Sequence, residues 1–318
     1  MPPTKETDVL TVATLREGGS KGAVECLFNE RQQIFTLTPD SNEAHASLVG
    51  RLGEAQERGA PVKVVLNPRR GAIVRVGPPS PDEVESSEAR ILLERPNRPL
   101  RIDVSSMDPI TTNIVDHYLK VPSFSLCDRI IPSYVEARTI FDFCAAQSCN
   151  LPGPPTIAPC IPFQYVIDGC YARAHQMRRI IEDRYGYCCE KVFSFANQGS
   201  DQLAVVASKW GGCCVTWWYH VAPLVRVRFR FRLGPFTLQL VLAMVIDPGM
   251  FDQPVLLSTW LLAQQNAACS PTAHVSMCSI QPGSAYTPAN YSGTAFTTDP
   301  AYTATDATLV NYASLTTC

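Results

Sequence analysis

Apolar and polar residues alternate in four short stretches near the start of the chain: residues 23–28, 33–37, 62–66 and 73–76. This period of two is typical of β-strands with one buried face. Between the second and third stretches, Leu48, Leu52 and Ala55 recur at helical spacing. The pattern predicts a small α+β domain over residues 1–80.

Proline and polar residues dominate the next segment, which contains GPPSP at residues 77–81 and ERPNRP at residues 94–99. This composition is typical of an exposed linker with at most short helices, and its arginines offer cleavage points to a protease. We therefore predict a linker with the cleavage region at residues 81–123 and a second domain at residues 124–318.

One segment of the second domain, FQYVIDGCYARAHQMRRII at residues 163–181, has a strong helical pattern. Ala174 and Met177 recur at helical spacing after an Asp-Gly turn, so the helix is expected to begin near Cys170. The partial positive charge at a helix N-terminus favours a thiolate and lowers a cysteine pKa. Cys170 is therefore the predicted nucleophile.

A thiolate nucleophile usually works with an imidazole base. His175 follows Cys170 by five residues, so the two side chains diverge on a helix and His175 is predicted to be a packing residue. His220 follows an aromatic and β-branched strand at residues 213–219, which would hold it rigidly. Asp247 ends an apolar strand just before a proline, where its carboxylate can orient an imidazole. These positions predict a triad of Cys170, His220 and Asp247.

Each member of this triad also fits a purely structural role. Cys170 could be half of a buried disulfide, as most cysteines of exported proteins are. His220 could be a hydrogen-bonded histidine of the sheet, and Asp247 could cap the end of its strand.

The chain has 318 residues, with 27 Lys and Arg against 29 Asp and Glu and a net charge of −2. This balance gives no general attraction for nucleic acid or an anionic membrane, so neither is predicted as a partner. The most apolar run, residues 235–246, falls short of the roughly 20 residues of a spanning helix. The polar start MPPTKETD lacks a secretion signal, so export would need a removed signal or another route.

The chain has thirteen cysteines, an odd number, and Cys26 is the one that precedes the linker. So many cysteines in a chain of this length indicate an oxidising compartment, with pairs and a spare thiol for chemistry. We therefore predict a secreted or exported protein.

Four of these cysteines could form a zinc site: Cys188, Cys189, Cys213 and Cys214. They lack the C-x₂-C spacing that places two thiolates on one metal, so disulfides are favoured and no metal is predicted. The local pairs that we consider are Cys149 with Cys160, Cys269 with Cys278, and one of Cys188 or Cys189 with one of Cys213 or Cys214.

Several blocks of the second domain resemble the active-site blocks of bacterial protein-glutaminases, which deamidate glutamine in proteins. The blocks are DGCYARAHQMR at 168–178, CEK at 189–191, GCCV at 212–215 with YHVA at 219–222, and IDP at 246–248. The resemblance covers residues 137–260. It implies an α+β fold with a papain/transglutaminase-like thiol hydrolase core, in which a helix carries Cys170 and antiparallel strands carry His220 and Asp247.

The same resemblance implies an activity. Cys170 would form a thioester with a protein-bound glutamine and release ammonia, and hydrolysis would leave glutamate without any cofactor. Substrates would be proteins or peptides with an accessible glutamine. Two tryptophans in sequence cannot share one face of a strand, so one is expected in the core and the other along the glutamine slot. The residues expected to line this slot are Tyr171, Trp217, Trp218 and Tyr219.

The first domain resembles the pro-region of that family, through FTLTP at 35–39, PVKVVLNP at 61–68 and SPDEV at 80–84. This implies a proenzyme in which the first domain blocks the active site until a protease cleaves the linker. A blocking segment should offer a glutamine. We predict Gln33, followed by Ile34 on its strand, with Gln32 as the alternative.

Three other readings of the chain stay open. A transglutaminase-like acyl transferase or a papain-like cysteine protease could use the same triad. The first domain could instead be the functional part, as a binding or inhibitor module. The alternating strand that contains Arg226, Arg228, Arg230 and Arg232 fits a solvated sheet face, or else a docking surface for acidic proteins.

Overall fold

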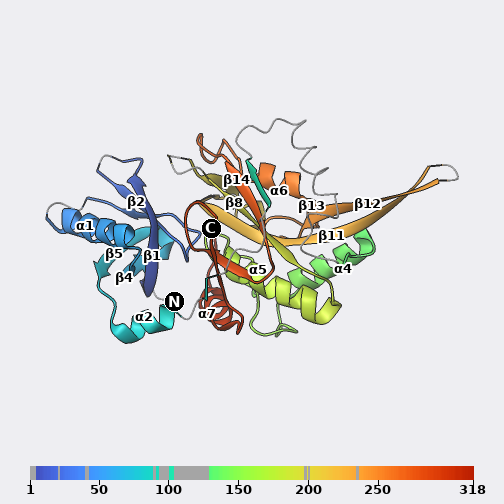
Figure 1. The fold of residues 1–318 in the computed structure, drawn as a ribbon, viewed down its shortest axis with the longest axis horizontal. Coiled ribbons are helices and arrows are strands. Elements are labelled where there is room, and N and C mark those ends of the chain that lie inside the picture. The colour runs from blue at the N-terminus through green and yellow to red at the C-terminus, as the bar shows by residue number, and fades with distance from the viewer. Residues whose placement is uncertain are drawn as a thin grey trace.

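The computed structural model describes residues 5–20, 22–39, 43–88, 91–92, 100–103, 129–196, 199, 201–233 and 236–318. The first five strands close into a barrel in the order β1-β2-β3-β5-β4, with helix α1 packed against it (Figure 1). The bounds are β1 Glu6–Glu17, β2 Val24–Phe28, β3 Phe35–Leu37, α1 Glu43–Arg58, β4 Pro61–Asn67 and β5 Ala72–Gly77.

Fully buried side chains such as Leu10, Phe28 and Val64 fill the barrel. The four predicted strands and the predicted helix are all present. Strand β1 is an addition to them. Its register against β2 shifts between Val12 and Thr14, and this bulge interrupts the strict alternation that identifies a strand in sequence.

The segment after the barrel contains more than the short helices predicted for it. Helix α2 covers Pro81–Glu88, and two short strands follow, β6 at Ile91–Leu92 and β7 at Leu100–Asp103. Strand β6 pairs with β16, Phe296–Thr298, and β7 pairs with β14, Met277–Gln281. The expectation of at most short helices is therefore wrong here, because both strands join sheets of the second domain. Residues 104–128, which complete the predicted linker, lie outside the described residues.

The second domain is built on a six-stranded antiparallel sheet in the order β13-β12-β11-β8-β14-β7. A two-stranded sheet of β9 and β10 and a three-stranded sheet of β15, β16 and β6 lie beside it. The further bounds are β8 Glu190–Phe195, β9 Leu203–Val206, β10 Cys214–Trp217, β11 Tyr219–Leu233, β12 Phe236–Val245, β13 Val255–Leu256 and β15 Ala285–Pro288.

Apolar side chains alternate between the two faces of the central strand β11 and enter two separate layers. Val221 and Val225 pack on one face, together with helices α4 and α5. Ala222 and Leu224 pack on the opposite face, together with α6. The helix bounds are α4 Tyr134–Ala145, α5 Cys170–Arg179, α6 Leu257–Ala263 and α7 Thr303–Tyr312. None of the described helices is long and apolar enough to cross a bilayer.

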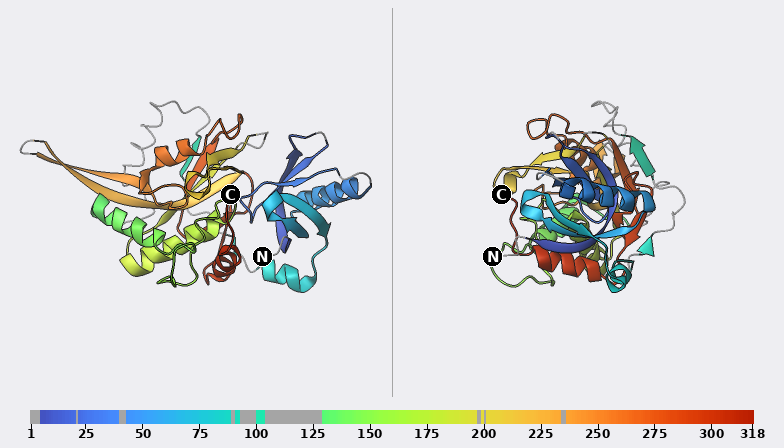
Figure 2. Two further views of the ribbon diagram at one scale, coloured as in Figure 1. Left: turned by 180° about the vertical axis from the view of Figure 1, so that it is seen from behind. Right: turned by 90° about the vertical axis from the view of Figure 1, so that its left-hand side faces the viewer.

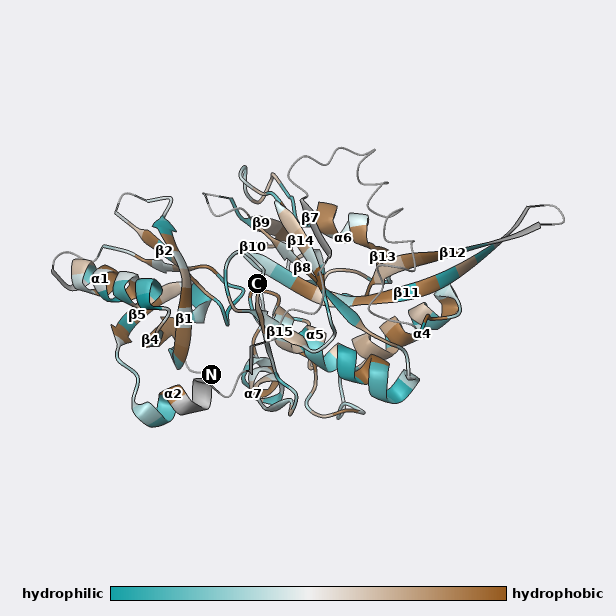
Figure 3. Ribbon diagram, in the orientation of Figure 1, coloured by the Kyte–Doolittle hydropathy of each residue, from teal (hydrophilic) through white to brown (hydrophobic). Residues whose placement is uncertain are grey.

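Strands β11 and β12 continue beyond the sheet as a two-stranded arm, at the end of the molecule opposite the barrel (Figures 1 and 2). Hydrophobic and hydrophilic bands alternate along this arm (Figure 3). Arg226 is buried and its Nε donates to Glu190 Oε2 at 2.9 Å, whereas Arg230 is exposed. A solvated basic face therefore fits the outer part of the arm alone; the side chain of Arg232 lies outside the described residues.

The disulfides join segments that are far apart in sequence. Cys213 is bonded to Cys318, and Cys214 is bonded to Cys269. Both thiols are therefore oxidised, which excludes them as zinc ligands. The expectation that one of them pairs with Cys188 or Cys189 is wrong, because each has a partner from a distant loop or terminus.

The remaining cysteines separate into bonded and free ones. The predicted pair Cys149–Cys160 is present, and Cys188 is also disulfide-bonded. The pair Cys269–Cys278 is wrong, because Cys278 is a free thiol within the apolar core. The free cysteines among the described residues are all buried: Cys26, Cys144, Cys170, Cys189 and Cys278.

Candidate active site

Helix α5 begins at Cys170, as the sequence pattern predicts. Gly169 precedes it with a φ of 79°, and a Cβ there would lie 2.8 Å from the Tyr312 ring, so both backbone and space require glycine. Cys170 is only 1% exposed. The helix packs against β11, which brings its first turn to the sheet that carries His220.

His220 of β11 is in direct contact with Asp247, which lies two residues after the end of β12. His220 Nε2 lies 2.9 Å from Asp247 Oδ2, and Trp260 Nε1 donates to the same oxygen at 3.0 Å. A carboxylate can only accept, so the neutral imidazole carries its proton on Nε2 and leaves the Nδ1 lone pair free. Trp217 stacks on the imidazole at 4.6 Å between ring centroids and fixes its plane.

The pKa values of this pair favour a neutral imidazole beside a carboxylate. Burial lowers the pKa of His220, although the Asp247 carboxylate opposes this change. Burial alone would raise the pKa of Asp247, but the hydrogen bonds from His220 and Trp260 hold it below its usual range. The neutral His220 can therefore accept a proton at Nδ1.

A glutamine of the barrel domain fills the space between the thiol helix and this imidazole. Gln32 is fully buried, and its Oε1 accepts the backbone N–H of Cys170 at 3.1 Å. Its Nε2 lies 3.2 Å from His220 Nδ1. The side-chain amide thus has its oxygen at a helix N-terminus and its nitrogen at an imidazole lone pair.

The backbone of the same glutamine is also held. Its N–H donates to Asp168 Oδ1 at 2.9 Å, and its carbonyl accepts the N–H of Trp218 at 3.4 Å. The next residue, Gln33, forms an antiparallel bridge with Trp217. This segment of the barrel domain is therefore held by its backbone against the residues where β10 meets β11.

The sequence prediction of Gln33 as the inserted glutamine is wrong, because it is one residue out of register. Its side chain turns back into the barrel domain, where Nε2 donates to the carbonyl of Pro68 at 2.8 Å. Neighbouring residues of an extended segment point to opposite sides, so only one of the two glutamines can face Cys170. That residue is Gln32. Ile34 packs against the apolar layer that includes Cys170.

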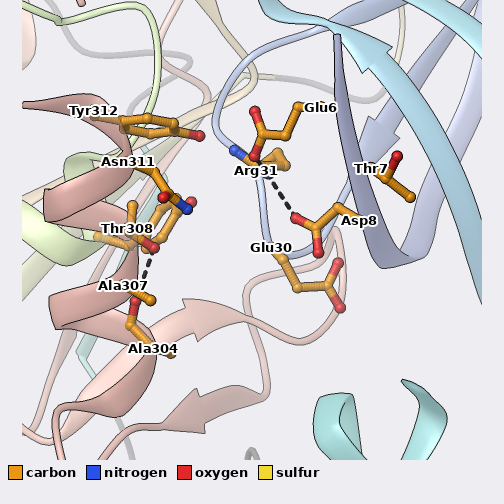
Figure 4. Close-up of a pocket in the computed structure, with 11 residues that line it drawn as sticks. Glu6, Thr7, Asp8, Glu30, Arg31, Ala304, Ala307, Thr308, Asn311 and Tyr312 are labelled. Atoms are coloured by element: carbon orange, nitrogen blue, oxygen red, sulfur yellow. Dashed lines mark hydrogen bonds and ion pairs between the residues drawn. The ribbon is translucent and has the colours of Figure 1, made fainter. Parts of the chain in front are cut away.

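An ion-pair cluster around Arg31 lies beside this contact and links the two domains. Figure 4 shows Arg31 with its partners of β1, Glu6 and Asp8. Arg31 NH1 donates to Asp168 Oδ2 at 3.1 Å, and its NH2 donates to Asp8 Oδ2 at 2.6 Å and to Glu6. Tyr312 donates its hydroxyl to the same Asp168 oxygen at 2.9 Å. Arg31, its two acidic partners of β1 and Tyr312 line a pocket of about 210 Å³ between α7 and the barrel.

The thiol does not have the lowered pKa that its helix position predicts. Burial raises the pKa of Cys170 well above its usual value, and the nearby Arg173 guanidinium offsets only part of that rise. The helix N-terminus favours the thiolate, but the bound barrel segment removes the water that would stabilise a negative charge. The thiol is therefore protonated while the barrel domain covers it.

The four predicted slot residues surround this contact in different ways. Trp217 and Trp218 enter opposite apolar layers, as expected for neighbours on a strand. Trp218 also donates its Nε1 to the carbonyl of Arg31 at 2.7 Å. Tyr219 is fully buried on the α5 side of the sheet, and Tyr171 lines the pocket that contains Arg31.

Several residues of the site were not identified from sequence. Trp260, Asp168 and Arg31 all contact the groups described above. Asp168 stands inside the block that resembles the protein-glutaminases, which is the one local signal available for it. His175 lies apart from the site: Lys191 Nζ approaches its Nδ1 to 2.6 Å, and its Nε2 lies 3.1 Å from the Asp299 carbonyl.

Comparison with known proteins places this arrangement in a family. A family model described as glutaminase matches residues 137–264. A crystal structure of pro-protein-glutaminase is 25% identical and covers 99% of this chain and 95% of its own, with a TM-score of 0.69. A mutant of pro-protein-glutaminase gives a TM-score of 0.65 at 25% identity, over 98% of this chain and 95% of its own. Among curated proteins, no sequence matches the chain.

A crystal structure of protein-glutaminase, without the pro-form, is 32% identical over 60% of this chain and 92% of its own, with a TM-score of 0.49. The family model and the similarity to the two pro-protein-glutaminase structures show that the chain is an enzyme, an amide hydrolase with a mixed α/β fold. It belongs to the protein-glutaminase family, and its similarity to pro-protein-glutaminase extends over nearly the whole chain.

Proposed function

We propose that the chain is the inhibited proenzyme of a protein-glutamine glutaminase, which converts protein-bound glutamine to glutamate and releases ammonia. The observation that carries this proposal is the placement of Gln32. Its side-chain amide oxygen is 3.1 Å from the Cys170 N–H, and its amide nitrogen is 3.2 Å from His220 Nδ1. A substrate glutamine would need the same two contacts.

The chemistry follows from these positions. Cys170 attacks the side-chain amide carbon, while the Cys170 N–H at the helix N-terminus stabilises the oxyanion. His220 takes the thiol proton at Nδ1 and returns it to the departing ammonia, and Asp247 holds the ring and its charge. Water then hydrolyses the thioester. A helix-borne cysteine opposite antiparallel strands that carry histidine and aspartate is the papain/transglutaminase-like arrangement.

The backbone contacts explain a preference for glutamine within a protein. Asp168 accepts the N–H of residue 32 and Trp218 donates to its carbonyl, so the site binds a peptide strand as well as an amide side chain. The aromatic groups around the slot, Tyr171, Trp217, Trp218 and Tyr219, exclude water from the reacting amide. A cysteine protease would instead need a backbone peptide group at the thiol, which makes that reading the weaker one.

We further propose that the barrel domain is an intramolecular inhibitor, which a protease releases by cleavage within residues 81–123. The barrel domain fills the substrate position with Gln32, which is hydrogen-bonded to the N–H of the buried Cys170. The disulfides fit an exported protein, because they persist in oxidising compartments.

The test is to cleave the linker, dilute the protein so that the barrel domain dissociates, and measure ammonia release from an added glutamine-containing protein. Ammonia is expected from the cleaved wild type and not from cleaved Cys170→Ala. A labelled primary amine in the same assay distinguishes an acyl transferase, which would attach it to the substrate. Absence of ammonia from the cleaved wild type would overturn the proposal.

The covered thiol gives a prediction for alkylation. In the intact native chain, iodoacetamide should leave Cys170 unmodified, because the thiol is buried and protonated. After cleavage and dilution, Cys170 should become the rapidly alkylated residue, identified by peptide mapping. Cys144 and Cys278 are controls, since both stay in the core and should remain unmodified in either form. Equal alkylation of Cys170 before and after cleavage would contradict its coverage by the barrel domain.

A further inference from the structure

We propose that Gln32 is itself a substrate of the enzyme, and that the intact proenzyme slowly converts it to glutamate. This makes position 32 a modification site within the inhibitory domain. The inference rests on the proposed function, since it needs Cys170 and His220 to act on a side-chain amide.

The contacts that hold Gln32 are those of a productive enzyme–substrate complex rather than those of a residue that only blocks the site. The oxyanion donor and the imidazole lone pair lie at hydrogen-bond distance from the amide oxygen and nitrogen, respectively. The backbone is held on both sides, by Asp168 and Trp218, so the side chain has little freedom to leave. Holding reactants in this way replaces a bimolecular encounter by a unimolecular step.

The reaction balances with water as its second reactant. The Cys170 sulfur bonds to the side-chain carbonyl carbon of Gln32, the carbon–nitrogen bond breaks, and the thiol proton passes through His220 Nδ1 to the departing ammonia. Water then adds to the thioester, the carbon–sulfur bond breaks, and a proton returns to the sulfur. A glutamate side chain at position 32 and the free thiol remain.

Two features of the site make this reaction much slower than the turnover of an added substrate. The bound barrel domain keeps the thiol buried and protonated, so little thiolate is present. The same coverage restricts the water needed for the second step. Gln32 can therefore act as an inhibitor on the timescale of folding and export and as a substrate over a longer period.

The product fits the site less well than the amide. A glutamate at position 32 replaces the amide nitrogen beside His220 Nδ1 with a carboxylate oxygen, so two acceptors then face each other in a buried site. The two nearby cations are already engaged: Arg31 with Asp168 and two acidic groups of β1, and Arg173 with the carbonyls of Tyr165 and Asp168. Conversion of Gln32 thus loosens the barrel domain before any cleavage occurs.

The experiment follows residue 32 in the intact chain by mass spectrometry. Purified wild type and Cys170→Ala are incubated in water enriched in heavy oxygen, digested with a protease that cuts after lysine, and the peptide of residues 22–63 is sequenced by fragmentation. The wild type should gain the mass of an amide-to-acid conversion, with one heavy oxygen, at position 32. Gln33 is the internal control for spontaneous deamidation, and Cys170→Ala should show no conversion beyond that background.

Conversion at position 32 equal to that at Gln33, or equal in Cys170→Ala, would overturn the inference. A chain that has lost one ammonia and whose Cys170 is still bonded to residue 32 as a thioester would overturn the hydrolysis step. The cleaved wild type is assayed in parallel on an added protein. If the cleaved wild type releases ammonia but Gln32 of the intact chain is unchanged, this inference alone is wrong. If the cleaved wild type releases no ammonia, the proposed function is wrong.

The effect on inhibition has its own test. Intact Gln32→Glu chain should show more ammonia release from an added protein than an intact wild type that is freshly prepared. Gln33→Glu is the matched variant, because it adds the same charge one residue away without entering the site. Equal inhibition of Gln32→Glu and wild type would contradict the loosening of the barrel domain.

Discussion

Replacing Asp247 with asparagine is expected to lower kcat of the cleaved enzyme about 10⁴-fold, with the fold retained. The carboxylate forces the His220 proton onto Nε2 and so leaves Nδ1 free for the thiol proton. An asparagine amide can donate to Nε2 instead, which places the His220 proton on Nδ1. His220 then cannot accept the thiol proton at that atom. The imidazolium formed during the reaction also loses its counter-charge.

The measurement is kcat and KM for ammonia release from a glutamine-containing protein, with thermal unfolding as a check on folding. Asp252→Asn is the matched control, because Asp252 lies on the same loop but is exposed and pairs only with Lys209 Nζ, at 2.9 Å. That variant should keep wild-type kcat. Retained kcat in Asp247→Asn would show that Asp247 does not orient the imidazole.

The features of the site that sequence reasoning could identify are those with local signals. The turn before Cys170 and the helical spacing after it place the thiol at a helix N-terminus, whatever the rest of the chain does. Asp247 stands at a strand end because proline follows it. Strands β2 to β5 of the barrel and helix α1 are likewise visible from their periods of two and 3.6 residues, because one face of each is buried.

The features that sequence reasoning missed depend on contacts between distant segments. The choice between Gln32 and Gln33 is a matter of strand register, and a shift of one residue reverses which side chain enters the site. The ion pair of Arg31 with Asp168 joins residues of different domains. The disulfides Cys213–Cys318 and Cys214–Cys269 also join remote segments, and spacing in sequence does not determine such pairings.

The pKa of Cys170 shows why an argument from local sequence can predict a shift in the wrong direction. The helix N-terminus acts on the thiolate through nearby N–H groups, and its effect is present in any state of the chain. Desolvation by burial acts in the opposite direction and is larger in the intact chain, where the Gln32 side chain lies against the helix N-terminus. A pKa shift of Cys170 on release of the barrel domain would therefore be part of activation.

Replacing Arg31 with methionine is expected to weaken the hold of the barrel domain on the enzyme. Arg31 is buried and bridges Asp168 of the enzyme domain to Glu6 and Asp8 of the barrel. Removing one partner of a buried ion pair leaves the others uncompensated, at a cost of about 3–5 kcal/mol. This corresponds to weaker association of the two parts by about 10²–10⁴-fold.

The measurement uses chain cleaved in the linker and assayed over a range of protein concentrations. In the wild type, specific activity should fall as concentration rises, because the released barrel domain binds again. In Arg31→Met, the same fall should need a concentration about 10²–10⁴-fold higher. Lys63→Met is the control, since the Lys63–Glu83 pair is partly exposed and belongs to the barrel side alone. Coincident curves for Arg31→Met and wild type would show that this ion pair does not hold the inhibitor. The binding energy of the inhibitor would then have to come from two other sources: the contacts of Gln32 with Cys170 and His220, and the surrounding apolar surface.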